Sequence, residues 1–385
     1  MIARTAGNPV DRVSVYIAAG LISGCGALMF NVMPVFVGGL SRSFGYDEAR
    51  LGDMVALFNL GFTIASITAA FWVRRFGWRL LAALGVAMAA AGLAVMAAAT
   101  GFAALAALMV VVGLAMGGLY ALTLAILGDS DNPDRAFGLK LGLETLPGAL
   151  LLFLLPAYVL PRYGFAGVAL AMALVILVLG AFFFNLPSAG VKSPAAAGEG
   201  GSRRWLMLPA LGLASSLLFF MGIASSWAFL ELIAQDRGLD GDVVGLVLSV
   251  GFLICGAGGF VAAALGERLG PRVPMIGVIL VNLAGLWFLS WFTGPVGYAA
   301  GSFLFLFSVN FTLAYTFGLT AKVDREGRLV VLSATCLSLG AVVGPAISGR
   351  LIAAEGYDMM LAFSAACSLA ALGCYLLLDR LRRAD

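Results

Sequence analysis

The chain has 385 residues, of which 62% are hydrophobic and only 11% are charged, whereas soluble domains average roughly 45–50% and about 25%. This composition excludes an ordinary water-soluble protein and indicates that a lipid bilayer surrounds much of the surface. The net charge of +3 comes from scattered basic residues, so we expect no nucleic-acid partner. The absence of histidine excludes imidazole metal sites, histidine-based catalytic triads and histidine proton relays.

Twelve apolar runs follow one another along the chain, and each is long enough to cross about 30 Å of hydrocarbon as a helix. They cover residues 13–40, 51–72, 80–99, 102–127, 137–160, 165–186, 205–233, 243–265, 273–292, 296–319, 329–352 and 359–378. The first run is too long for the apolar core of a cleaved signal peptide. All five cysteines lie in these runs without metal-ligand spacing, so we expect buried thiols, with no metal and no other cofactor.

A stretch that contains the second run occurs twice. Residues 45–79 align without a gap on residues 238–272, at an offset of 193, and nine of the 35 positions are identical. Each copy has a polar turn, an apolar run and a basic turn, which together describe one membrane crossing with its flanking loops. The sequence therefore predicts two related halves, and internal repeats of this size in membrane proteins are typical of transporters.

The basic residues give an orientation. Of the 23 Lys and Arg residues, 18 fall on the side of the membrane that holds both termini and 5 on the other side. By the positive-inside rule we expect both termini to be cytoplasmic, in the cell's inner membrane. We divide the chain into a terminus (1–12), a first six-helix bundle (13–186), a linker rich in Pro, Ala, Gly and Ser (187–204), a second bundle (205–378) and a tail (379–385).

A basic turn containing glycine follows the second span of each half. The two turns read Ala70, then Arg74-Arg75-Phe76-Gly77-Trp78-Arg79, and Ala263, then Glu267-Arg268-Leu269-Gly270-Pro271-Arg272. With the six-plus-six spans and the central linker, these turns resemble the major facilitator superfamily of secondary transporters over nearly the whole chain. The resemblance implies an all-α membrane protein of twelve transmembrane helices in two pseudo-symmetric six-helix bundles. We expect this protein to act as a monomer.

The turns also suggest gating residues. The family's pattern has an acidic residue where the first copy has Arg74 and the second has Glu267. A gating salt bridge carried over from the family is therefore best placed at Glu267 and Arg268. In the first half, Arg75 is the candidate, and it could meet the acidic loop at residues 129–134, which we otherwise expect to be solvated.

The family's first, fourth, seventh and tenth helices line a central cavity, and this resemblance selects the substrate-binding candidates. They are Phe30, Asn31, Tyr120, Trp227, Asn310, Phe311 and Tyr315. Pro34 is expected to kink the first helix close to the Asn31 amide. Aromatic and amide groups with few fixed charges suit a small amphipathic or aromatic organic molecule. The alternative is that the aromatic rings belong to the core and that the amides bond neighbouring helices.

Two acids within apolar runs are candidates for proton coupling. Glu231 has no basic residue within a helical turn, the nearest being Arg237, and its repeat counterpart is Gly38. Desolvation favours the protonated form of such a carboxyl, although it could also be an interfacial residue. Glu144 lies four residues after Lys140, on the same helical face. This pair is either part of a proton pathway or a structural ion pair near a cytoplasmic gate.

Three functions remain open. We favour secondary transport of a small molecule coupled to protons, because carboxyls are available inside the spans and no nucleotide-binding loop is present. A multidrug or solute efflux antiporter is a second possibility, and a lipid flippase or scramblase on the same fold is a third. An enzyme is not expected, because no two intramembrane acids are placed to form a catalytic pair.

Overall fold

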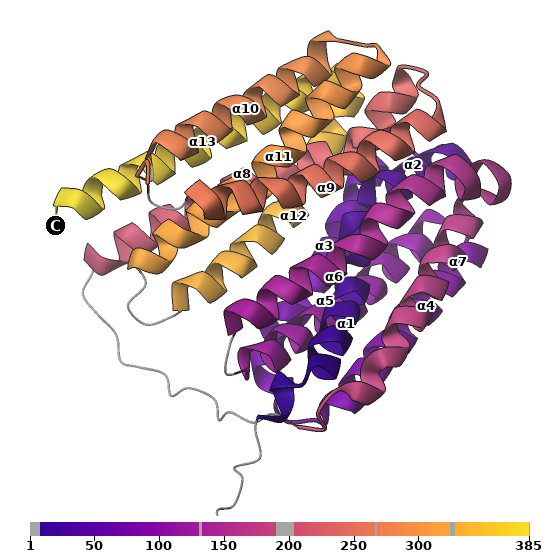
Figure 1. Cartoon of the computed structure of the whole chain (residues 1–385). Helices are drawn as coiled ribbons and strands as arrows, with labels where there is room; N and C mark the ends of the chain where they lie inside the picture. Colours follow the sequence, from indigo (N-terminus) through magenta and orange to yellow (C-terminus); the bar gives the residue numbers. More distant parts are fainter. Residues whose placement is uncertain are drawn as a thin grey trace, which may run out of the picture.

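The computed structural model describes residues 8–130, 133–189, 204–265, 268–270, 272–323 and 328–384, and every regular element in these residues is a helix (Figure 1). The long helices are α1 (Val13–Asn31), α2 (Met33–Phe44), α3 (Glu48–Trp72), α4 (Trp78–Ala98), α5 (Phe102–Gly128), α6 (Pro133–Leu154), α7 (Leu160–Gly180), α8 (Arg204–Asp236), α9 (Gly241–Leu265), α10 (Arg272–Trp291), α11 (Pro295–Val323), α12 (Arg328–Glu355) and α13 (Tyr357–Ala384). Short helical turns, η1 (Pro9–Asp11), η2 (Leu155–Val159) and η3 (Ala181–Asn185), complete the set.

The helices agree with the predicted spans. Eleven stretches of the described residues are long and apolar enough to cross a membrane, and one of them, Leu143–Asn185, has 43 residues. At about 1.5 Å per residue this stretch is long enough for two crossings. Gly164, with φ of 59°, interrupts its helical conformation. The fifth and sixth predicted runs are therefore joined by a very short turn at this glycine.

The first predicted run consists of two helices. α1 ends at Asn31 and α2 begins at Met33, with Val32 in a non-helical conformation between them. The break has a local cause, because Pro34 has no backbone N–H and its ring crowds the carbonyl four residues earlier. The Phe30 carbonyl is that group, so it is left without its usual helical donor.

The repeat is visible in the backbone. α3 and α9 begin 193 residues apart, and so do α5 and α11. The matched glycines Gly45 and Gly238 both have left-handed backbones, with φ of 63° and 66°. This conformation is strained for residues that have a Cβ, which explains why both copies have glycine here. In the first copy the Asp47 carboxylate then accepts the Arg50 N–H at 2.8 Å and caps α3.

The matched arginines of the basic turns have the same structural role in each half. Arg79 donates from Nε to the Leu186 carbonyl at 2.6 Å, and Arg272 donates from Nε to the Asp379 carboxylate at 2.5 Å. Leu186 and Asp379 are themselves 193 residues apart. Each arginine thus ties the start of the third span of its half to the end of the sixth.

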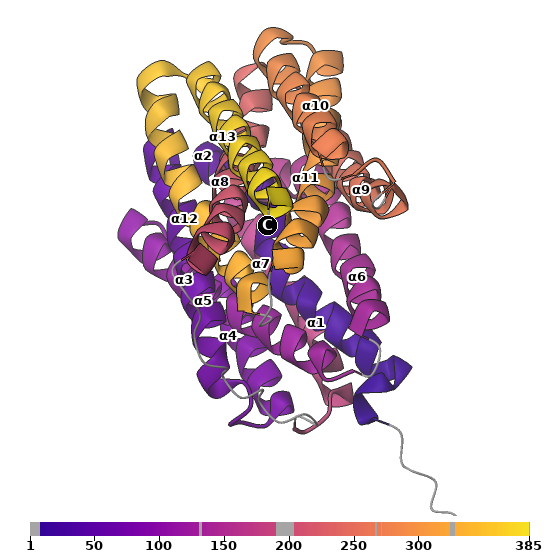
Figure 2. The same cartoon turned by 90° about the vertical axis from the view of Figure 1, so that its left-hand side faces the viewer.

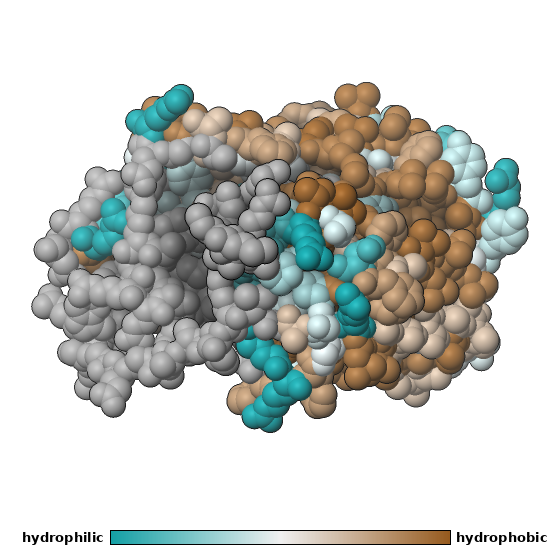
Figure 3. Space-filling view, turned by 60° about the horizontal axis from the view of Figure 1, so that its bottom comes forward, coloured by the Kyte–Doolittle hydropathy of each residue, from teal (hydrophilic) through white to brown (hydrophobic). Residues whose placement is uncertain are grey.

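Most of the packing between the two halves comes from three pairs of long helices among the described residues. α2 lies against α8, α3 against α12, and α6 against α9 (Figures 1 and 2). Large apolar side chains cover the outside, including Phe71, Phe184, Phe260 and Trp291, each at least 67% exposed. In Figure 3 such hydrophobic residues cover most of the right-hand flank. An outer surface of this kind is stable in lipid and not in water.

Candidate functional site

The halves meet near the face opposite the termini, which we call the distal face; it carries the turns at Gly45, Gly164, Gly238 and Gly356. Backbones cross there at very short range. A Cβ on Gly52 would overlap the Pro345 carbonyl, and a Cβ on Gly349 would overlap the Glu48 carbonyl.

The second crossing joins α9 to α6. A Cβ on Gly245, the repeat counterpart of Gly52, would lie 2.9 Å from the Phe153 carbonyl oxygen. Deeper along the same pair, Ser249 donates to the Ala149 carbonyl at 2.8 Å. Glycine at both matched positions therefore allows the halves to approach closely, as small residues do in membrane helix pairs.

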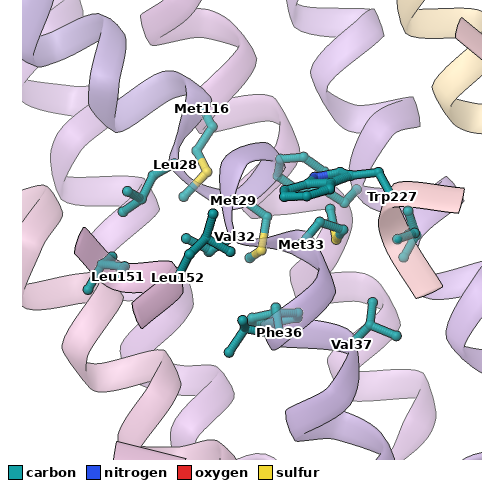
Figure 4. Packing of buried hydrophobic residues seen from close by; sticks show 14 of the residues in the cluster. Leu28, Met29, Val32, Met33, Phe36, Val37, Met116, Leu151, Leu152 and Trp227 are labelled. Atoms are coloured by element: carbon teal, nitrogen blue, oxygen red, sulfur yellow. The ribbon is translucent and has the colours of Figure 1, made fainter. Parts of the chain in front are cut away.

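Trp227 of α8 also bridges the halves. Its indole N–H donates to the Phe30 carbonyl at 2.8 Å, which is the carbonyl released by Pro34. Bilayer interiors offer no water to satisfy such a group, so the bond from the other half compensates for the kink. In Figure 4 the Trp227 ring reaches toward the α1–α2 junction, where Met29 and Met33 belong to the same buried cluster. The Phe30 ring stacks on Phe220 of the second half, with centroids 5.6 Å apart.

Glu231 of α8 lies in this interface with no exposed surface. Arg42 from the end of α2 is 3.6 Å from Glu231 Oε1, and Gln235 donates to the same oxygen at 3.2 Å. No basic residue lies within a helical turn of Glu231 in the sequence, but the fold brings Arg42 of the other half beside it. Arg237 instead donates to the Leu289 and Phe292 carbonyls.

The space for the Glu231 side chain exists because its repeat counterpart is glycine. A Cβ on Gly38 would lie 2.7 Å from Glu231 Oε1 and 2.5 Å from Gln235 Nε2. The second carboxylate oxygen, Oε2, is buried without a hydrogen-bond partner among the described residues. Such a group is costly in its ionised form and makes this contact sensitive to the charge on Glu231.

A second polar cluster lies inside the first half. The expected pairing of Lys140 with Glu144 is present, with Nζ 2.8 Å from Oε2. Ser23 of α1 donates to the same oxygen at 2.7 Å, and Asn31 Nδ2 donates to the Glu144 carbonyl at 3.3 Å. The Lys140 ammonium also lies 4.1 Å from the centre of the Tyr120 ring. The sequence suggested Asn31 and Tyr120 for substrate binding, Lys140 for gating and Glu144 for proton coupling. The structure brings these four residues together.

The remaining cavity candidates belong to α11 in the second half. Phe311 is buried and stacks on Tyr315, with centroids 5.2 Å apart, and Asn310 is exposed. Phe311 therefore also fits the alternative of a core residue. Asn310 keeps an accessible amide within a predicted span.

The residues predicted for gating make no ion pair with one another among the described residues. Arg75 and Arg268 are both exposed, and Glu267 lies outside the described residues. Arg74 makes a two-pronged contact with Asp129, at 2.7 and 3.2 Å. Asp129 is 1% exposed, so the expectation that it is solvated is wrong, and Arg74 is its ion-pair partner. The pair has the reverse polarity of the family's pattern, because the basic member occupies the position where the family has an acid.

The chain was also compared with known protein families, sequences and structures. A family model described as Major Facilitator Superfamily matches residues 18–321 and, in a second match, residues 212–385. No curated protein sequence matches the chain.

Several solved structures share the fold. A bacterial homologue of the human lysosomal transporter Spinster, in an inward-facing and occupied conformation, has a TM-score of 0.70 and 14% identity, over 95% of this chain and 96% of that one. The nucleoside transporter NupG has a TM-score of 0.73 and 12% identity, over 94% and 98%. A D-xylose–proton symporter has a TM-score of 0.74 and 13% identity, over 94% and 97%.

Proposed function

Because the chain belongs to the major facilitator superfamily and is a secondary transporter, we propose that it carries a small amphipathic or aromatic organic solute across the cytoplasmic membrane, coupled to protons. The solute binds between the halves, which close alternately over it. Several transporters with this fold act on small molecules, and one is described as a proton symporter.

The observation that carries this proposal is the polar cluster around Glu144. Glu144 is the eighth residue of the fifth predicted apolar run, which places it about 10 Å inside that run and within a hydrocarbon layer about 30 Å thick. Ionisable groups at that depth are costly and are mostly functional. The positions 193 residues after Lys140 and Glu144 hold Ser333 and Leu337, so the repeated scaffold does not require the pair.

The carboxyls of Glu144 and Glu231 differ in their exposure, so we assign them to two different steps of the transport cycle. The Glu144 side chain is 11% exposed, whereas the Glu231 side chain is 0% exposed. We assign the exchange of the coupled proton to Glu144. Glu231 and Arg42 then hold the distal face closed, and a proton on Glu231 weakens this contact.

The orientation is part of the proposal. With both termini in the cytoplasm, the closed distal face is extracellular and the chain is in an inward-facing state, as the Spinster homologue is described to be. Cysteine substituted for Ser193 in the linker is expected to react with an impermeant maleimide only in inside-out vesicles. Cysteine at Thr100, an exposed residue of a distal turn, is expected to react only in right-side-out vesicles. Reaction of both from one side would contradict the twelve-span topology.

The coupling is tested in proteoliposomes with radiolabelled aromatic and amphipathic solutes, with and without a pH gradient. The wild type is expected to accumulate its solute only with the gradient. Glu144→Gln removes the proton acceptor but keeps the shape, so it should retain solute exchange and lose accumulation. Glu355→Gln, at an exposed acid near the end of α12, is the control and should behave as wild type.

Two outcomes would refute the proposal. Accumulation by Glu144→Gln equal to that of the wild type would exclude Glu144 as the coupling group. Movement of a fluorescent phospholipid without any gradient, in the absence of solute transport, would favour a scramblase instead.

A further inference from the structure

Lys140 differs in its surroundings from the other basic side chains that the structure describes. It is the one buried basic side chain in the part of the chain that the structure describes, at 2% exposure. Its ammonium contacts Glu144 Oε2 at 2.8 Å and the face of the Tyr120 ring at 4.1 Å. Ser23 donates to that same carboxylate oxygen. The partner of Lys140 is therefore a carboxylate that another donor also holds in place.

The helices packed against α6 place no further charge beside this cluster. Of the elements packed against α6, α1 presents the neutral Ser23 and Asn31, and α5 presents Tyr120. α9 has one charged residue, Asp242, at its distal end. The interior of this cluster thus holds one positive and one negative charge, and its net charge is zero.

This balance limits what can bind. An anionic solute that approaches Lys140 while Glu144 is ionised would place two negative charges beside one positive charge in a medium of low dielectric. A proton on Glu144 without a solute would leave Lys140 as a buried and unpaired cation, which is also costly. Each event is unfavourable alone, and together they restore neutrality.

Resting on the proposed function, we propose that the solute is an organic acid with a single carboxylate, which replaces Glu144 as the partner of Lys140 when Glu144 takes up a proton. The solute anion and the proton enter the site together, and Lys140 keeps its charge throughout. One carboxylate contact to the ammonium breaks and another forms, so the loaded and empty sites have the same net charge. Solute and proton therefore move in the same direction, one for one, without net transfer of charge.

The surroundings of the cluster fit the rest of such a molecule. Tyr120 lies 5.7 Å from Phe62, measured between ring centroids. The Tyr120 ring beside one buried ammonium, with Phe62 next to it, favours a monocarboxylate with an apolar body. A dicarboxylate would keep one negative charge without a partner.

Binding is measured by the thermal stabilisation of the purified full-length protein with matched acids and amides: benzoate and benzamide, phenylacetate and phenylacetamide, indole-3-acetate and indole-3-acetamide, butyrate and butyramide. We expect acids to stabilise the wild type, and to bind more tightly in acidic than in alkaline buffer because binding takes up a proton. Each matched amide should bind at least about tenfold more weakly. Equal stabilisation by amides, or stabilisation by none of the acids, would overturn the proposal.

Two variants identify the residues. Glu144→Gln imitates the protonated form, so its affinity for acids should be high and independent of pH. The double variant Lys140→Met with Glu144→Gln leaves no buried charge unpaired, so it should fold and bind none of the acids. Acid binding by the double variant that matches the wild type would show that Lys140 is not the anion ligand.

Uptake measurements distinguish a failure of the organic-acid proposal from a failure of the proposed proton-coupled transport. Uptake of an acid driven by a pH gradient, and unchanged by a potassium diffusion potential with valinomycin, is the expected result. Gradient-driven uptake of amides without uptake of acids would refute the acid but leave proton-coupled transport intact. Acid binding with uptake that ignores the pH gradient would refute the coupling in both proposals while the ligand class remained supported.

Discussion

Gly52→Val is expected to keep the distal face open and to reduce transport by at least about tenfold. Even a single Cβ at Gly52 would overlap the Pro345 carbonyl of the other half. A backbone carbonyl in a helix cannot turn aside as a side chain can, so the closed arrangement becomes strained. Overpacking of this kind costs about 1–3 kcal/mol, and 1.4 kcal/mol changes an equilibrium tenfold. The penalty applies only when the halves are in contact, so it shifts the balance between the two states.

The measurement uses spin labels at Thr100 and Thr293, exposed residues of the two matched distal turns. The distribution of distances between them should move to longer values in Gly52→Val. Gly256→Val is the matched control in α9, because a Cβ there meets nothing within 4 Å. A short distance and normal transport in Gly52→Val would show that the crossing of α3 and α12 does not have to be tight.

Arg42→Met is expected to open the distal face as well, through charge instead of volume. Removal of Arg42 leaves Glu231 with Gln235 as its remaining hydrogen-bond donor, in a site with no exposed surface. Loss of one partner from a fully buried ion pair costs about 3–5 kcal/mol. We expect the lower end of that range, because the Arg42 side chain is 35% exposed.

A double variant shows whether the effect of Arg42→Met comes from the unpaired charge on Glu231 or from lost packing. Arg42→Met combined with Glu231→Gln has no unpaired charge, so it should regain the short distance between the Thr100 and Thr293 labels. Arg350→Met breaks another ion pair between the halves, Arg350 with Asp53 at 2.7 Å. Both of its side chains are more than one-third exposed, and such pairs contribute about 0–1 kcal/mol. An effect of Arg350→Met as large as that of Arg42→Met would contradict the assignment.

The sequence was sufficient to predict the fold class and the family, and both are confirmed. It was sufficient because the signals are local or repeated: apolar runs of membrane length, and glycines and arginines at one fixed offset. Gly45 with Gly238 and Arg79 with Arg272 were visible as identities before their turns and contacts were known. Repetition marks the positions that the scaffold itself requires.

The interface between the halves was less accessible to sequence reasoning. Arg42 and Glu231 are 189 residues apart in the chain and belong to no shared pattern. Arg74 and Asp129 meet because the second and fourth spans are neighbours, which the spacing of the residues does not reveal. One signal was available and missed. Pro34 removes the usual helical donor of the Phe30 carbonyl, which favours a further buried donor from another helix.

In the proposed transport cycle, the Phe30 carbonyl has a different role in each state. While the distal face is closed, the Trp227 indole occupies the Phe30 carbonyl. When the halves separate there, Trp227 moves away with the second half, and the acceptor faces the space that opens between them. In the proposed cycle, the state with an open distal face therefore offers an incoming molecule a hydrogen-bond acceptor that the closed state conceals. The two ends of the transport cycle then have different binding chemistry, although no residue changes its protonation to make that difference.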